Sequence, residues 1–178
     1  CSEEGFGYLF ASGNDWRSQL GNRNVGIRPV IQQSQLFVGK PFQFVVSSYN
    51  YTLAKASDGT IYGFGDNYYG QLGDGTSKNI RDLPVQLLEN KNVIGLCGGF
   101  AHAMAVMDDG TVWAWGSNFY GQIGNNGSWD HDTYLVPTLI DTDFVESVSC
   151  GAFHSVALTS SGSVYTWGIN INGELGDG

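Results

Sequence analysis

Two histidines are the residues of this chain best suited to catalysis. His102 and His154 each lie fourteen residues before the glycine of a Trp-Gly pair, and Ser155 follows His154 directly. A catalytic base needs one nucleophile and one orienting group that meet in a cleft. A histidine that returns once per repeat is more simply a structural part of that repeat, hydrogen-bonded to a neighbouring turn. We therefore predict no catalytic residue and expect that this segment is not an enzyme.

One acidic loop offers ligand atoms for a metal ion. Asp130, His131 and Asp132 stand next to one another, but the run lacks the spacing of a known ligand set. None of the glycine motifs has the Gly-x4-Gly-Lys-Ser/Thr form that cradles phosphate, and none opens a helix. We therefore expect a solvated surface loop and predict neither a metal site nor a cofactor site.

The elements that carry these residues come from an internal repeat. Its most regular part is a glycine turn, which reads Gly-Ser-Asn-Phe-Tyr-Gly-Gln-Ile-Gly in the copy at 116–124. Four copies begin at Gly13, Gly65, Gly116 and Gly168, so the period is 51 or 52 residues. Four matching copies at a nearly constant period are typical of a repeat array.

Each repeat contains about four short strands. Segments rich in aromatic and β-branched residues precede the glycine turns, and Asp-Gly or Ser-Gly turns join two of them to an earlier strand as a β-hairpin. Pro29, Pro84 and Pro137 follow the turns, which suits the start of a strand or an edge strand. No segment has sustained helical periodicity. Apart from the proline-containing strands, the expected strands are 8–12, 42–46, 61–64, 93–96, 103–107, 112–115, 145–148, 155–159 and 164–167.

Four-stranded units repeated radially form a β-propeller, whereas a stacked β-solenoid, the competing architecture, usually has shorter repeats. The residues of 118–124, 150–158 and 164–168 also resemble a known family, the regulator of chromosome condensation (RCC1) repeats. The resemblance covers nearly the whole chain and implies an all-β fold, a seven-bladed β-propeller of RCC1 type.

At this period the chain supplies about three blades plus partial repeats, or about half of such a ring. We therefore expect a fragment whose remaining blades belong to a longer parent chain, and Cys1 in place of an initiating Met fits a fragment or a processed chain. Within the propeller segment 1–178, the repeats are placed at approximately 8–59, 60–110 and 111–162, with a partial repeat at 163–178.

Aromatic residues occupy the positions of the glycine turn that change from copy to copy. They are Tyr68 and Tyr69 in one copy and Phe119 and Tyr120 in the next, and Trp129 lies on the longer polar loop that follows. These rings could form a binding surface on one propeller face, or they could cover the edges of the blades. Rings on polar loops expose apolar area unless they pack back or meet a partner. These five residues are our candidates for partner binding.

The charge balance excludes several classes of ligand. Eight Lys and Arg stand against seventeen Asp and Glu, for a formal net charge of −9, and no run of three basic residues occurs. Phosphate backbones and anionic lipids attract clustered basic residues. We therefore expect no nucleic acid, chromatin included, and no membrane to bind through this segment. A basic surface on a partner protein fits the charge better.

The three cysteines do not suggest a disulfide framework. Cys97 and Cys150 lie among apolar or small residues, so we expect buried free thiols that pack like small hydrophobic side chains. The sequence contains no apolar run of eighteen residues and no signal peptide. We expect an intracellular protein, cytoplasmic rather than nuclear.

These observations favour a non-enzymatic protein–protein interaction scaffold, a propeller segment of a larger regulatory or signalling protein. The resemblance implies an alternative, guanine nucleotide exchange on a Ran-like small GTPase, in which tight binding to the nucleotide-free GTPase weakens its affinity for nucleotide. Family exchange factors use face loops and an inserted wedge hairpin, and the motifs quoted above do not include those residues. A fused catalytic domain is a third hypothesis, and it would lie outside this segment.

Overall fold

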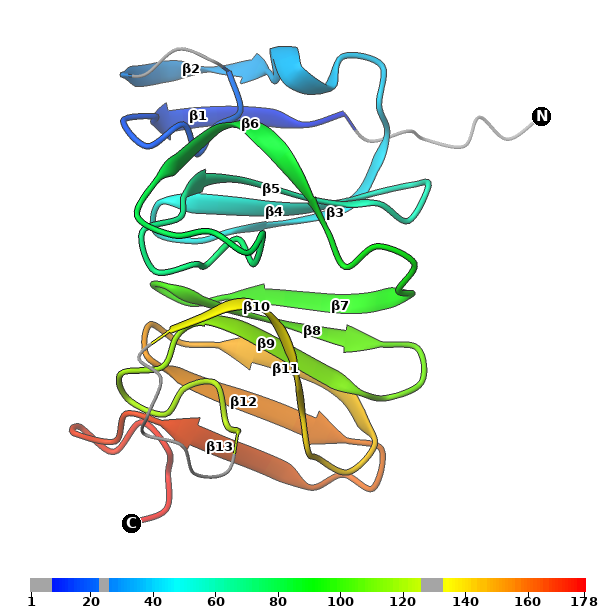
Figure 1. Cartoon of the computed structure of the whole chain (residues 1–178), viewed down its shortest axis with the longest axis vertical. Helices are drawn as coiled ribbons and strands as arrows, with labels where there is room; N and C mark the ends of the chain where they lie inside the picture. Colours follow the sequence, from blue (N-terminus) through cyan, green and yellow to red (C-terminus); the bar gives the residue numbers. More distant parts are fainter. Residues whose placement is uncertain (1–7, 23–25, 126–132) are drawn as a thin grey trace.

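The computed structural model describes residues 8–22, 26–125 and 133–178. Within these ranges the chain forms thirteen β-strands and one short 3-10 helix, η1 (Gln35–Phe37). The strands make four antiparallel sheets that follow one another along the long axis of the molecule (Figure 1). No helix in the described ranges is long and apolar enough to cross a membrane. The predicted all-β class is confirmed.

Each complete sheet contains four strands in the order of the sequence. The first strands of neighbouring sheets contact one another, so they form the inner side of the assembly, and the fourth strands β6 and β10 are outer edges. The sheets contain β1 (Phe10–Asn14) and β2 (Ile27–Gln33); β3 (Phe42–Ser47), β4 (Tyr51–Ala56), β5 (Ile61–Asp66) and β6 (Ile80–Leu87); β7 (Val93–Gly98), β8 (His102–Met107), β9 (Val112–Ser117) and β10 (Thr133–Ile140); and β11 (Val145–Cys150), β12 (His154–Thr159) and β13 (Val164–Gly168).

The prolines lie inside the outer strands rather than at their starts. Pro84 belongs to β6 and Pro137 to β10, and each of these strands has a shift in register where it pairs with the third strand. An outer edge tolerates proline because no further strand needs its missing N–H group. The sheets begin at Phe42, Val93 and Val145, so each blade combines strands from two consecutive sequence repeats.

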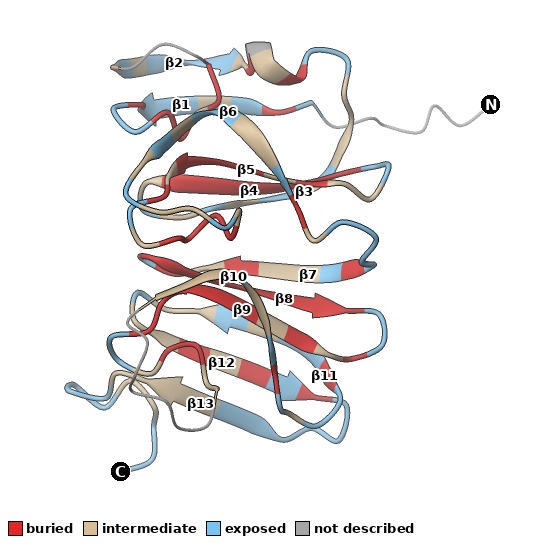
Figure 2. Cartoon of the chain, in the orientation of Figure 1, coloured by how far each residue is buried: buried red, intermediate tan, exposed pale blue. Residues whose placement is uncertain are grey.

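The second strands of the two complete blades are buried along their whole length, as Figure 2 shows for β4 and β8. Apolar packing continues from one blade into the next, because one cluster joins Tyr51 and Leu53 of β4 with Ala105 of β8 and Trp115 of β9. The two complete blades therefore share one apolar cluster.

The Trp-Gly motif joins neighbouring blades. The indole Nε1 of Trp115 donates a hydrogen bond to the backbone oxygen of Gln71, 2.9 Å away in the glycine turn of the preceding blade. Trp167 makes the same bond to the oxygen of Gln122, also at 2.9 Å. Gly73 lies against the Trp115 ring, where an added Cβ would be 2.8 Å from a ring carbon. The repeated tryptophan and glycine thus form an inter-blade contact.

Antiparallel pairing places two kinds of connection at opposite ends of the sheets. The glycine-loop face carries the connections from first to second strands and the glycine turns after the third strands. The hairpin face carries the connections from second to third strands and those that lead to the next sheet. In the described part, the glycine-loop face contains 15–22, 48–50, 67–79, 99–101, 118–125, 151–153 and 169–178, and the hairpin face contains 34–41, 57–60, 88–92, 108–111, 141–144 and 160–163.

Candidate partner-binding face

The glycine turn presents its two variable residues to solvent. After β9, the Oδ1 of Asn118 accepts a hydrogen bond from the Ile123 amide at 3.1 Å, and the Oε1 of Gln122 accepts one from the Tyr120 amide at 2.9 Å. Both polar side chains are buried, so they hold the turn from inside. Phe119 and Tyr120 remain outside, 48% and 45% exposed.

The same construction occurs one blade earlier. The Oδ1 of Asn67 accepts a hydrogen bond from the Leu72 amide at 3.0 Å, and the Oε1 of Gln71 accepts one from the Tyr69 amide at 2.8 Å. Tyr68 is exposed and Tyr69 is half-buried. The repeated polar residues thus determine the backbone of the turn, and the variable positions determine its surface.

The rings displayed by neighbouring turns meet one another. The ring centroid of Tyr69 lies 5.0 Å from that of Tyr68 and 5.9 Å from that of Phe119. Tyr120 lies 5.3 Å from Phe153 of the next blade. All three contacts are edge-to-face, an arrangement that aromatic pairs prefer. The structure therefore brings four of the five sequence-based candidates to one face.

Three further rings extend this set, and the sequence did not single them out. Phe153 lies 5.2 Å from Phe100, which stacks on Tyr49 at 4.7 Å. These residues stand on the connections from first to second strands, which reach the same end of the sheets as the glycine turns. The recurrence of an aromatic residue in these connections was visible in the sequence, but the proximity of the rings depends on the sheet topology. The seven rings, called the aromatic patch below, are Tyr49, Tyr68, Tyr69, Phe100, Phe119, Tyr120 and Phe153.

Some of the predicted positions do not join the patch. Trp129 and the run Asp130, His131 and Asp132 lie outside the described residues. Among the residues that are described, no group of three His, Cys, Asp or Glu side chains is placed to hold a metal ion.

His102 forms a bridge between blades. Its Nε2 lies 3.0 Å from the Oγ of Ser155, and that hydroxyl donates to the backbone oxygen of Gln122 at 2.8 Å. Because the serine proton is used in this way, Nε2 acts as the donor to Ser155. Burial, together with nearby His154, lowers the pKa of His102 to about 4. This geometry supports the predicted structural role, since a fully buried His–Ser pair cannot reach a substrate.

The structure corrects the expectation of two free thiols. Cys97 and Cys150 form a disulfide, with their Cα atoms 5.5 Å apart. The bond joins β7 to β11, the first strands of neighbouring blades, and these strands lead directly to Phe100 and Phe153. The pair is 53 residues apart, one residue more than the repeat at this point, so the cysteines are not at equivalent positions. The stagger between adjacent blades brings them together.

Comparison with known families agrees with the repeat that the strands and glycine turns show. Two models of the regulator of chromosome condensation (RCC1) repeat match the chain, one at 58–106 and 109–158 and the other at 42–71, 93–122 and 145–174. The three matches to the second model begin at the first residues of β3, β7 and β11.

The chain belongs to the RCC1 repeat family. Among curated relatives, it is 38% identical over 183 residues to the human E3 ubiquitin-protein ligase HERC2, a match that covers 99% of this chain and 4% of that protein. It is 32% identical over 141 residues to the Arabidopsis thaliana ultraviolet-B receptor UVR8, covering 79% of this chain and 32% of the receptor. The chain therefore spans only a small part of these relatives.

Solved structures show the same fold. Prp20p from Saccharomyces cerevisiae has a TM-score of 0.83 at 22% identity, over 96% of this RCC1 segment and 43% of that chain. Human WBSCR16 has a TM-score of 0.79 at 26% identity, over 89% of this chain and 42% of the other. The predicted RCC1-type propeller segment is confirmed, and RCC1 propellers are protein-interaction modules.

Proposed function

We propose that this RCC1 segment is a non-catalytic scaffold that binds a protein partner through the aromatic patch. The observation that carries the proposal is the convergence of seven rings, from loops of three blades, on the glycine-loop face. Large aromatic side chains are common anchors of protein interfaces. The match to short parts of HERC2 and UVR8 supports a segment within a larger regulatory protein, and any catalytic domain of that parent would lie elsewhere.

Photo-crosslinking tests which surface meets the partner. A benzophenone amino acid at Phe119 should cross-link a specific protein in the cells of origin. The same group at Leu83 should not, although Leu83 is similarly exposed, because it lies on the outer edge strand β6. Equal cross-linking from both positions would contradict the proposal.

The cross-linked protein would then be purified and its affinity measured. Phe119→Ser combined with Tyr120→Ser should weaken binding at least tenfold, while Leu83→Ser should leave it unchanged. All three residues are exposed, so each change should alter stability by only about 0.5 kcal/mol. Unchanged affinity of the double variant would remove the aromatic patch from the interface.

Exchange activity on a small GTPase is a narrower version of this proposal. Prp20p has been studied for binding to Gsp1p and histones, but its 22% identity to this chain supports a common fold alone. We expect the chain not to accelerate release of labelled GDP from Ran, and acceleration would establish exchange instead. An intracellular, mainly cytoplasmic location belongs to the proposal, and imaging of the tagged parent protein tests it.

A further inference from the structure

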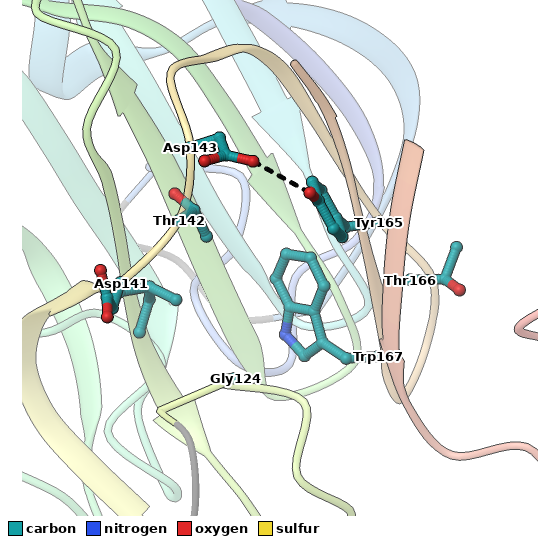
Figure 3. Close-up of a pocket in the computed structure, with 8 residues that line it drawn as sticks. Gly124, Asp141, Thr142, Asp143, Tyr165, Thr166 and Trp167 are labelled. Atoms are coloured by element: carbon teal, nitrogen blue, oxygen red, sulfur yellow. Dashed lines mark hydrogen bonds between the residues drawn. The ribbon is translucent and has the colours of Figure 1, made fainter. Parts of the chain in front are cut away.

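A groove of about 530 Å³ separates the end of β10 and its following loop from β13. Figure 3 shows Asp141 and Asp143 on one wall and Tyr165 and Trp167 on the other. Both carboxylates are exposed, and Tyr165 is 45% exposed. The groove therefore combines two negative charges with two aromatic rings.

The two preceding blades fill the equivalent place with their own cation. Lys91 stands two residues before β7, and its Nζ lies 4.5 Å from the ring centroid of Trp113, the second residue of β9. Lys40 stands two residues before β3, and its Nζ lies 4.7 Å from the ring centroid of Tyr62, the second residue of β5. This Nζ also donates to the Tyr62 hydroxyl at 2.6 Å and pairs with Asp58 at 3.0 Å. Both complete blades thus place a lysine ammonium against the aromatic ring at this position.

The last, three-stranded blade (β11–β13) has the aromatic ring but not the lysine. Asp143 stands two residues before β11, in the place of the lysines, and Tyr165 is the second residue of β13. The Tyr165 hydroxyl donates to the Oδ2 of Asp143 at 2.9 Å. This bond raises the pKa of Tyr165, so the phenol keeps its proton and remains the donor.

A second replacement changes the chemistry of the groove wall. Leu88 directly follows β6 and packs against the apolar cluster that contains Trp115. Asp141 directly follows β10 and therefore takes the corresponding position. Its carboxylate has neither a hydrogen-bond partner nor an ion-pair partner among the described residues. The positions of a leucine and a lysine in the earlier blade are thus both occupied by aspartate.

We propose that this groove receives a lysine or arginine side chain from a basic segment of a partner protein. The cation would occupy the position that Lys91 has over Trp113, with Asp141 and Asp143 as its counter-charges. Carboxylates and aromatic rings are the groups that bind guanidinium and ammonium most favourably.

A neighbouring cavity favours a peptide segment over a single cation. It has a volume of about 430 Å³, lies on the other side of the 141–144 loop, and is lined by Asp109, Leu139 and Phe144 among others. Asp141 borders both cavities. A chain that places one cation in the groove can therefore lay neighbouring residues across Asp109 and Phe144. This surface is separate from the aromatic patch.

The test uses the whole chain and a peptide of Gly and Ser with two arginines, beside a peptide with citrulline in place of arginine. Citrulline keeps the shape of the side chain but lacks the charge. NMR titration should show saturable shifts of the Trp167 indole N–H signal with the arginine peptide. The citrulline peptide should bind at least tenfold more weakly.

Asp143→Lys is the decisive variant, because it supplies the cation that the two complete blades already have. It should weaken binding of the arginine peptide at least tenfold while the spectrum of the folded chain is kept. Asp82→Lys makes the same charge change at an exposed position of β6 and should alter binding less than twofold.

Three results would overturn the proposal: equal binding of the two peptides, wild-type affinity of Asp143→Lys, or equal losses in Asp143→Lys and Asp82→Lys. The last would mean that the net charge, and not the groove, attracts the peptide. If Asp143→Lys failed to fold, Asp141→Asn would provide the same comparison, with Asp82→Asn as its control. Photo-crosslinking at the aromatic patch tests a different surface, so the two proposals can fail separately.

Discussion

Trp115 joins two blades through one side chain. It is fully buried, it belongs to the apolar cluster between the blades, and its indole donates a hydrogen bond to the oxygen of Gln71. Truncation would remove the packing and leave that carbonyl without its partner. At this scale, Trp115 is a determinant of stability.

We expect Trp115→Ala to lower the free energy of unfolding by about 3–5 kcal/mol, the usual cost of truncating a buried aromatic side chain. Urea unfolding followed by circular dichroism measures this. Trp16→Ala is the control, since Trp16 is 60% exposed and its loss should change stability by only about 0.5 kcal/mol. Similar midpoints for the two variants would show that Trp115 is misplaced.

Gly116 must be glycine because of its backbone conformation and because of the close contact that a side chain would make. A comparison with Gly121 separates these two effects. Its φ is +97°, and an added Cβ would lie 2.4 Å from the backbone oxygen of Ala101. Gly121 has a φ of +76° with open space around it. Gly121→Ala should therefore cost only the left-handed strain, about 1–2 kcal/mol. Gly116→Ala should cost about 1–3 kcal/mol more, from overpacking. Equal losses in urea unfolding would exclude the steric contribution.

At the scale of the elements, polar bridges between β-strands hold the blades in register. His102 begins β8 and contacts Ser155 near the start of β12, and the Tyr51 hydroxyl donates to the His102 backbone oxygen at 2.5 Å. These side chains occupy equivalent or adjacent positions in successive blades, so one blade supports the next. The bridge requires a neutral imidazole, because the ring is buried and, among the described residues, no carboxylate pairs with it.

Stability should therefore depend on the protonation of His102. Its pKa is about 4 in the folded chain and about 6.5 when unfolded. The contribution of neutral His102 to the free energy of unfolding is fully present above pH 6.5. It is lost as the pH falls toward 4, by roughly 3 kcal/mol in total. The wild type should lose more stability than His102→Gln between pH 7 and pH 4.5 in urea unfolding. Parallel profiles would mean that His102 does not titrate in this way, since the carboxylates are common to both proteins.

At the scale of the whole molecule, the two ends of the sheets differ in chemistry. The glycine-loop face carries the aromatic patch, and the hairpin face carries the acidic loop 141–144. The disulfide between Cys97 and Cys150 fixes the inner strands of two blades and thereby the spacing of Phe100 and Phe153. Covalent and aromatic contacts thus act together at one blade junction.

Reduction of this disulfide should lower the free energy of unfolding by about 2–4 kcal/mol, because the bond limits the conformational entropy of the unfolded chain over a long loop. Urea unfolding with and without dithiothreitol measures the loss. Cys97→Ala combined with Cys150→Ala should abolish the response to reductant, whereas Cys1→Ser should retain it. Maleimide labelling of all three cysteines in the folded, unreduced chain would contradict the pairing.

Much of the fold could be predicted from the sequence because the repeat depends on local chemistry. Positive φ values at the turn glycines, with buried Asn and Gln side chains in the two complete blades, determine these turns within nine residues. The alternation of strands and turns then follows, and the exposed positions of Tyr68 and Phe119 follow from the turn. The outer strands were less predictable, because edge strands tolerate proline and irregular register.

Only the tertiary structure decided which residues of different blades meet. The stagger and rotation between sheets are properties of packing, and spacing within one repeat does not encode them. They pair two cysteines that are not equivalent in the repeat, and they extend the predicted aromatic contacts to Phe100 and Phe153. They also place Asp141 and Asp143 opposite Tyr165, at the position where the preceding blade has Lys91 against Trp113. The sequence by itself therefore determined the blade, and blade-to-blade packing determined the surfaces.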